Sequence, residues 1–155
     1  ELAKKKPIVQ NAIDLVQALG VAQPKVAMLS AVEIPNPKMP ATLEYVELCK
    51  MAEQGQITGG LLDGPLAFDL AISQEAVACK KITSKVAGDA DILLMPEIQA
   101  GNILFKALGY FASSIVAGIV LGAKFRVIFT SRSAVVAERA TSCMLARFYD
   151  RFMQK

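Results

Sequence analysis

Ser131, Arg132 and Glu138 lie within one short segment, RVIFTSRSAVVAERATS, in which an apolar strand pattern leads into a helical pattern. A hydroxyl, a guanidinium and a carboxylate are groups that can hold an anion and move a proton. The same residue types also occur as a helix cap followed by charges on a solvated face, and spacing alone favours that plainer interpretation. The segment is therefore either a capped helix start or an anion-handling site.

The chain contains no histidine, and this limits the chemistry that it can do. Ser-His triads, histidine-ligated zinc and imidazole acid–base catalysis are all removed, so any proton transfer must use a carboxylate, a thiol or groups of the substrate. Cys49, Cys79 and Cys143 are odd in number and scattered, which indicates neither a disulfide framework nor a zinc site. We therefore expect a cytoplasmic protein with no metal site.

The charge of the chain is mildly positive, with seventeen basic and fourteen acidic residues and a net charge of +3. No long basic run accompanies this excess, which argues against a nucleic-acid surface and favours small acidic molecules as partners. Residues 107–123 carry no charge, but their length is at the lower limit for a membrane span, and glycines and serines interrupt them. We expect the end of a helix and a short buried strand there, and no membrane segment.

Strand and helix patterns alternate along the chain. Continuous apolar runs predict strands at residues 25–31, 57–64, 90–98, 117–122 and 126–130. Helical periodicity predicts helices at residues 8–19, 40–55, 67–82, 100–111 and 134–152. Strands that are apolar throughout and alternate with helices predict an α/β fold, with a mostly parallel sheet and helices on both faces.

Polar residues follow four of the predicted strands, at the carboxyl ends where such sheets bind ligands. Three of these loops lead into helix N-termini, whose free N–H groups and dipole favour anions. The loops contribute Ser30, Asn36, Lys38, Asp63, Asp69, Asn102, Ser131 and Arg132. Asp63 in a DGP turn and Asn102 near a helix start are more often turn or cap residues than catalysts. Spacing and chemistry alone thus reach an α/β domain with an edge suited to a phosphate-bearing ligand.

Four longer segments stand at these same loops: VAMLSAVEIPNPKMPAT, GQITGGLLDGPLAFDLAIS, KVAGDADILLMPEIQAGNILFK and VIFTSRS. In order and separation they resemble the phosphate acetyl/butyryltransferase family, specifically the carboxyl-terminal half of phosphate butyryltransferase-like proteins. The resemblance implies transfer of an acyl group, butyryl or acetyl, between acyl phosphate and coenzyme A, with inorganic phosphate released or consumed. It also implies an isocitrate/isopropylmalate dehydrogenase-like fold in a two-domain enzyme, with the site between the domains.

The resemblance also implies roles for single residues. Ser131 would hold the coenzyme A sulfur, and Arg132 would grip phosphoryl oxygens through its planar, bidentate guanidinium. Acetyl-specific members carry an Asp seven positions beyond the Ser, proposed as the base for the thiol, and here that position is Glu138, whose longer arm leaves the role open. The candidates for binding the substrate and coenzyme A are Ser30, Asn36, Lys38, Asp63, Asp69 and Asn102.

No metal and no bound cofactor are required by the implied reaction, in which coenzyme A is a co-substrate. An acyl phosphate is already activated, so the enzyme needs to generate a thiolate, neutralise phosphate charge and align the reactants. This chemistry is compatible with a chain that has no histidine.

By the same resemblance, residues 1–155 form the carboxyl-terminal portion of such an enzyme. An initial helix and linker would occupy residues 1–22, an α/β domain residues 23–132, and a terminal helix residues 133–155. That helix would return to a missing amino-terminal domain, which in the family supplies further arginines for the phosphate, and a homodimer is expected. We therefore expect the isolated chain to be a poor catalyst.

Two other classes of function stay open on the sequence. A dehydrogenase of the same fold would use NAD and a divalent metal on a hydroxy acid, but it needs an acidic cluster and the aspartates here are dispersed. A non-catalytic coenzyme A-binding or assembly domain is favoured by the missing half and by Glu138 at the family's Asp position.

Overall fold

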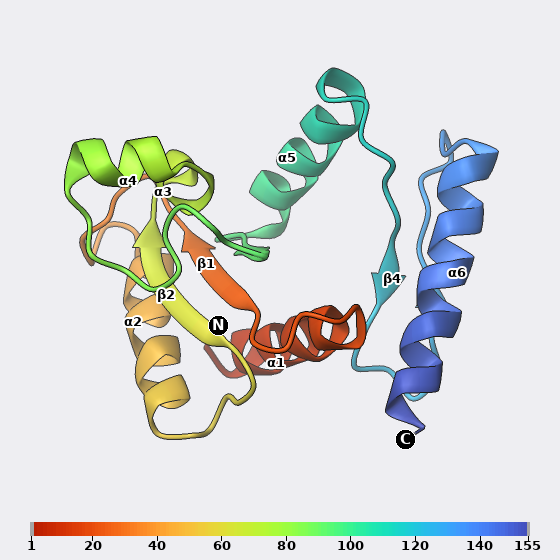
Figure 1. Ribbon diagram of the computed structural model, residues 1–155, viewed down its shortest axis with the longest axis horizontal. Helices are drawn as coiled ribbons and strands as arrows, with labels where there is room; N and C mark the ends of the chain where they lie inside the picture. The colour runs from red at the N-terminus through yellow and green to blue at the C-terminus, as the bar shows by residue number, and fades with distance from the viewer. Residues whose placement is uncertain (1, 155) are drawn as a thin grey trace. The chain divides into compact units, whose positions relative to one another are not determined.

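The computed structural model describes residues 2–154, which form two compact units that meet in sequence after Ile98 (Figure 1). The first unit contains α1 (Leu2–Ala18), β1 (Lys25–Leu29), α2 (Pro40–Glu53), β2 (Leu61–Leu66), α3 (Phe68–Ile72), α4 (Gln74–Lys80) and β3 (Ile92–Leu94). The second contains α5 (Ile98–Phe111), which begins at the boundary, β4 (Ile119–Val120), β5 (Val127–Ile128) and α6 (Val136–Met153). Within residues 2–154, no helix combines the length and the apolar character needed to cross a bilayer.

β1 is the central strand of a three-stranded parallel sheet and lies between β2 and β3. Val26 pairs with Leu62 on one side and with Ile92 on the other. The last four residues of β1 are buried, and a strand that is buried on both faces needs a layer of helices on each. The predicted α/β class with a parallel sheet is confirmed.

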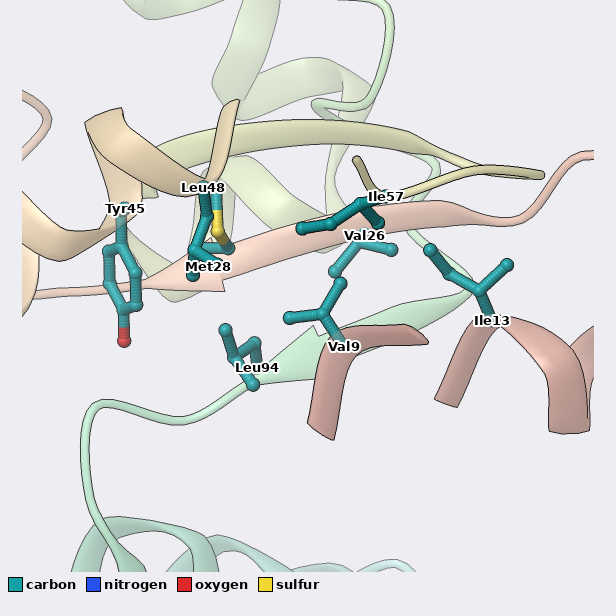
Figure 2. Close-up of a cluster of buried hydrophobic side chains, with 8 residues drawn as sticks. All are labelled: Val9, Ile13, Val26, Met28, Tyr45, Leu48, Ile57 and Leu94. Atoms are coloured by element: carbon teal, nitrogen blue, oxygen red, sulfur yellow. The ribbon is translucent and has the colours of Figure 1, made fainter. Parts of the chain in front are cut away.

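Each face of the sheet has its own apolar cluster, because successive residues of a strand point to opposite faces. The first cluster joins the sheet to α1 and α2 (Figure 2), and its buried members are Val9, Ile13, Val26, Met28, Tyr45, Leu48, Ile57 and Leu94. The second joins the sheet to α3, and its buried members are Ala27, Leu29, Leu66, Leu70, Ala71, Val86 and Ala87. Helices therefore cover both faces, as the continuously apolar strands predict.

α1 begins at Leu2 rather than at the predicted Ile8, and Pro7 lies inside it. A proline normally marks the first turn of a helix, because its nitrogen has no hydrogen to donate. Contacts between α1 and α2 offset the lost bond: Lys5 Nζ lies 2.7 Å from Glu44 Oε2 and 4.8 Å from the centre of the Tyr45 ring. The helix therefore continues through the proline.

The single helix predicted over residues 67–82 is two helices, α3 and α4, which are separated at Ser73. The backbone of Ser73 is extended, and its hydroxyl oxygen accepts a hydrogen bond from Ala76 N–H at 3.2 Å. Serine in this role is a preferred N-cap, because it satisfies an N–H group that has no partner within the helix. The cap starts a new helix where periodicity alone predicts a continuous one.

β4 and β5 form an antiparallel pair in the second unit, in which Ile119 pairs with Ile128 and Val120 with Val127. The prediction that residues 117–122 and 126–130 add strands to the parallel sheet was therefore wrong. The stretch between them, Ala123–Phe125, is too short for a parallel connection, which needs a crossover of a dozen or more residues. A short turn suffices for an antiparallel pair.

α6 carries a narrow buried stripe made of Ser142, Ala146 and Tyr149. The segment before β5 packs near it, because the Arg126 guanidinium lies 5.0 Å from the centre of the Tyr149 ring and Arg126 Nε lies 3.5 Å from Asp150 Oδ1. In contrast, Met144 and Phe148 on the same helix are 63% and 53% exposed. Only one side of α6 is therefore buried within the second unit.

Tyr45→Phe is expected to lower the free energy of local opening at β1 by about 1–2 kcal/mol. The buried Tyr45 hydroxyl donates to the carbonyl oxygen of Leu29 at 3.1 Å, so phenylalanine leaves that oxygen without this donor. Native-state hydrogen exchange of the β1 amides measures the change. Tyr110→Phe, at a side chain that is 74% exposed, is the matched control, and equal protection in wild type and Tyr45→Phe would contradict the prediction.

Candidate active site

The carboxyl end of β1 is held by two hydrogen bonds. Ser30 N–H donates to the carbonyl oxygen of Leu66 at 2.9 Å, and the Tyr45 hydroxyl donates to that of Leu29 at 3.1 Å. Burial raises the pKa of Tyr45, so its hydroxyl keeps its proton and remains a donor. Ser30 therefore lies at the carboxyl edge of the sheet, beside the end of β2.

Asn36 and Lys38 lie in the loop that leads from β1 into α2. Asn36 Oδ1 accepts from Lys38 N–H at 2.9 Å, and Asn36 N–H donates to Oγ1 of the buried Thr42 at 2.8 Å. These bonds make an Asx turn before α2, while the Lys38 side chain is exposed. Residues 32–37 line an open hollow of about 320 Å³ on the surface of this loop.

Asp63 lies within β2, opposite Ala27 of β1, rather than in a loop that follows a strand. β2 begins at Leu61, four residues later than predicted, because α1 holds the preceding turn. The side-chain amide of Gln10 takes both hydrogen-bonding groups of Thr58 that a neighbouring strand would otherwise bind. Its Oε1 accepts from Thr58 N–H at 2.9 Å, and its Nε2 donates to the Thr58 carbonyl at 3.1 Å. β2 therefore lies later in the sequence than predicted, and it includes the DGP segment.

Gly64 fixes the place of Asp63 against β1. A Cβ atom at Gly64 would lie 2.7 Å from Met28 Cβ and 2.8 Å from the Met28 carbonyl oxygen, so only glycine fits. Asp63 Oδ1 accepts from Gly64 N–H at 2.8 Å. The carboxylate is therefore held by its own neighbour in a closely packed strand.

Cys49 of α2 lies near Asp63, and its chemistry is limited by its surroundings. Burial, together with the negative charges of Asp63 and Glu53, raises the pKa of the Cys49 thiol to about 11. A thiol with that pKa is almost fully protonated at neutral pH, and the thiolate is the reactive form. Cys49 therefore packs against the first apolar cluster as a protonated thiol at neutral pH.

Asp69 lies in the first turn of α3, where Lys80 of α4 holds it. Lys80 Nζ lies 3.1 Å from Asp69 Oδ2 and 3.1 Å from Oε1 of Glu33, which belongs to the loop after β1. The hydrogen bond from Lys80 lowers the pKa of Asp69, and the two carboxylates raise the pKa of Lys80. Lys80 thus ties the loop after β1 to α3.

Ser131 follows β5 in the second unit, and its hydroxyl lies among three polar groups. Lys106 Nζ of α5 lies 3.3 Å from Ser131 Oγ, Ser133 Oγ lies 2.9 Å from it, and Ser133 N–H donates to it at 3.3 Å. Arg132, at the next position, is exposed. An ammonium beside a hydroxyl, followed by a guanidinium, suits an anionic ligand.

Asn102 lies in the second turn of α5, because this helix begins at Ile98 and not near Ala100 as predicted. Asn102 is exposed and precedes Lys106 by four residues, so both lie on the same side of the helix. The expected position of Asn102 near the helix cap was therefore wrong, and the residue belongs to the side of α5 that carries Lys106.

Glu138 caps α6. Its Oε2 accepts from Val135 N–H at 3.2 Å, in the first turn of the helix. Val135 has no side-chain acceptor, so only the glutamate half of a capping box exists. The serine cap that spacing allows is absent at this N-terminus, since Val135 and not a serine is the N-cap. A carboxylate has two oxygens, so capping with one is compatible with accepting a proton on the other.

The structure distributes the predicted residues between the two units. The first unit carries Ser30, Asn36, Lys38, Asp63 and Asp69, and the second carries Asn102, Ser131, Arg132 and Glu138. Sequence reasoning missed Lys80 and Lys106, whose partners Glu33 and Ser131 lie 47 and 25 residues away. No local pattern marks such a lysine, and only the family-like segment AGNILFK places Lys106 near a loop of interest.

Comparison with known proteins identifies the family. The family described as phosphate acetyl/butaryl transferase matches residues 1–146. The chain belongs to this family. The resemblance drawn from the four loop segments is thereby confirmed.

Named relatives and a solved structure agree with this assignment. The chain is 53% identical over 149 residues to the phosphate acetyltransferase of Rhizobium meliloti, covering 96% of this chain and 47% of the relative. It is 46% identical over 146 residues to the phosphate butyryltransferase of Clostridium acetobutylicum, covering 94% and 48%. A branched-chain phosphotransacylase from Enterococcus faecalis matches with a TM-score of 0.85 and 40% identity, over 96% of this chain and 53% of that one. The chain thus spans about half the length of these relatives.

Lys80→Met is expected to raise the pKa of Asp69, because the hydrogen bond from Lys80 is what lowers it most. Titration of the Asp69 carboxyl carbon by NMR measures this directly. Lys81→Met, which removes the same charge one residue away, is the matched control and should leave the titration in place. An Asp69 titration that does not move in Lys80→Met would show that the ion pair is absent in solution.

The same variant carries a stability signature with a definite sign. A carboxyl whose folded pKa is depressed stabilises the fold above its unfolded pKa, and loses this contribution as pH falls through the folded pKa. The stability gap between wild type and Lys80→Met should therefore be present at neutral pH and close on acidification. Urea unfolding at a series of pH values follows the gap.

Proposed function

We propose that this chain is part of a phosphate acyltransferase that moves an acetyl or butyryl group between acyl phosphate and coenzyme A. The observation that carries the proposal is the 3.3 Å contact between Lys106 Nζ and Ser131 Oγ, in the loop that also bears Arg132. Glu138 follows in the first turn of the next helix. The family membership supplies the reaction, and these residues supply the groups that it needs.

In the proposed reaction the coenzyme A thiolate attacks the carbonyl carbon of the acyl phosphate. The carbon–sulfur bond forms, the bond from that carbon to the phosphate oxygen breaks, and inorganic phosphate leaves with the electron pair. Glu138 accepts the thiol proton, and Arg132 binds phosphoryl oxygens as a planar fork. The positions of the reactants, held in line by the site, account for much of the rate.

In this scheme Lys106 orients the hydroxyl group of Ser131. The ammonium donates to Ser131 Oγ, and in the scheme the hydroxyl hydrogen of Ser131 turns from Ser133 Oγ, which lies 2.9 Å away, to the coenzyme A sulfur when coenzyme A binds. A free thiol has a pKa of about 8.5, and positive charge nearby lowers it. Lys106 thus favours the thiolate while Ser131 holds it.

The remaining candidates belong to the binding part of the proposal. We assign Ser30, Asn36, Lys38, Asp63, Asp69 and Asn102 to orienting the substrate and coenzyme A. The scheme uses coenzyme A as a co-substrate and requires neither a metal nor a bound cofactor. The proposed setting is the cytoplasm.

The proposal extends to the whole protein. We propose an isocitrate/isopropylmalate dehydrogenase-like, two-domain enzyme, in which residues 1–22, 23–132 and 133–155 form the initial helix, the α/β domain and the returning helix. An amino-terminal domain and a second copy are the proposed partners. The exposure of Met144 and Phe148 on α6 supports a further covering surface, and the chain by itself would be a poor catalyst.

A non-catalytic coenzyme A-binding domain is the second candidate function. The hydrogen bond from Val135 N–H to Glu138 Oε2 favours it, because this bond gives the carboxylate a structural role at the start of α6. The NAD- and metal-dependent dehydrogenase is not favoured, since the relatives named above are acyltransferases.

The test of the proposed function is an assay of the full-length gene product with acetyl, propionyl and butyryl phosphates and coenzyme A. Thioester formation, followed by ultraviolet absorbance, is expected with the acetyl or the butyryl substrate. Calorimetric titration with coenzyme A runs in parallel. Binding without a thioester from any of the three would establish the non-catalytic candidate instead, and absence of both would refute the site.

The substitution Glu138→Gln distinguishes a role of Glu138 as a base from its role in capping α6. Glutamine keeps an oxygen for Val135 N–H but removes basicity, so the rate at neutral pH should fall by roughly 10²- to 10⁴-fold while coenzyme A affinity changes little. The residual rate should rise with pH as the thiol ionises unaided, up to about pH 8.5. Steady-state kinetics across this pH range measure both effects.

Glu75→Gln is the matched control, because Glu75 also lies in the first turn of a helix, α4. It should leave the rate and the pH profile as in the wild type. A normal rate in Glu138→Gln would assign Glu138 to the cap alone.

A further inference from the structure

Gly118, which directly precedes β4, makes hydrogen bonds through both its N–H and its carbonyl oxygen. Its N–H donates to Ser142 Oγ of α6 at 3.1 Å, and its carbonyl oxygen accepts from Phe129 N–H at 2.9 Å. Ser142 is almost fully buried, and its own hydroxyl hydrogen goes to the carbonyl oxygen of Glu138 at 2.8 Å. One serine hydroxyl therefore links the first turn of α6 to the strand pair.

The approach of Gly118 to β5 is very close. A Cβ atom at Gly118 would lie 2.2 Å from the carbonyl oxygen of Phe129, which is a backbone atom and cannot turn aside. Gly118 has an ordinary backbone conformation, so it is the lack of a side chain that the site needs. The end of β5 is thereby fixed against Gly118, and Gly118 is fixed against Ser142.

This set of hydrogen bonds connects the segment that carries Ser131 with the first turn of α6, which carries Glu138. Phe129 stands two residues before Ser131, and Ser142 stands one helical turn after Glu138, to whose carbonyl it is bonded. Ser131 and Glu138 are otherwise connected by the turn through residues 132–135. The path through Phe129, Gly118 and Ser142 is a second, independent constraint on their separation.

We propose that Ser142 is a positioning residue for the acyl transfer, which sets the separation of Ser131 and Glu138 by holding Gly118 to α6. This inference rests on the proposed function. Ser142 does not touch the reactants; it acts by fixing the end of β5 relative to the helix that carries the base. A group displaced by about 1 Å from its working position costs on the order of 10²-fold in rate, so such a constraint has a kinetic consequence.

The kinetic test compares Ser142→Ala with Thr141→Ala in the full-length gene product. Thr141 is half-buried and makes the same kind of bond, from its hydroxyl to the Ala137 carbonyl at 2.8 Å, but this bond is exposed and does not involve Gly118. Ser142→Ala should lower kcat by about 10- to 100-fold with little change in KM, and Thr141→Ala should stay within about twofold of wild type. Equal rates for the two variants would overturn the inference.

A double mutant separates positioning from general damage. If Ser142 acts through Glu138, the loss caused by Ser142→Ala should shrink to about twofold in the Glu138→Gln background. If the two losses multiply in full, Ser142 does not act on the base, and the inference fails.

Hydrogen exchange supplies a readout that does not depend on activity. Ser142→Ala should speed exchange at the amides of Gly118 and Phe129, and Thr141→Ala should not. If the wild type transfers no acyl group, the proposed function fails by itself, while unchanged exchange at both amides overturns the inference whatever the activity. Should Ser142→Ala not fold, Ser142→Cys takes its place, because a thiol is close in size to the hydroxyl but a weaker hydrogen-bonding group, with a smaller fall in kcat expected and the same loss of effect in the Glu138→Gln background.

Discussion

Burial of β1 on both of its faces is the constraint on which the first unit depends. Four consecutive buried residues cannot be covered by one layer, so helices must lie on each side of the sheet. Each fully buried aliphatic side chain contributes about 1.5–3 kcal/mol, which is enough to outweigh a proline inside α1 and a broken helix at Ser73. Parallel pairing then brings the carboxyl ends of the strands to one edge, where Ser30 lies beside Leu66 at the end of β2.

The second unit is held together in a different way. Few of its side chains are buried, and its order comes from polar contacts at specific atoms, such as the link from Gly118 to Ser142 and the cap made by Glu138. A buried N–H that loses its acceptor costs about 1–3 kcal/mol, so these contacts matter more here than in a unit with a large core. The residues proposed for chemistry lie on this hydrogen-bonded scaffold.

The sequence predicted those parts of the fold that depend on neighbouring residues or on a repeating apolar pattern. Apolar runs identified β1 and β3, periodicity identified α2 and α6, and the loop segments identified the family. It failed where a distant contact decides: Gln10 delays the start of β2, and Lys5 extends α1 past Pro7. The antiparallel pairing of β4 and β5 could have been predicted, because the short stretch between the two segments excludes a parallel crossover. For the site, residue types near Ser131 were informative, but Lys106 became visible only through its contact.

The ion pairs of Lys80 have a consequence for the chemical durability of the protein. Acyl phosphates react spontaneously with neutral amines, and a protonated lysine has no electron pair with which to attack. Because Glu33 and Asp69 raise the pKa of Lys80, a smaller fraction of this amine is neutral at any given pH. The lysine that ties the loop after β1 to α3 is thus less readily acylated than a lysine without acidic partners, and it keeps its charge.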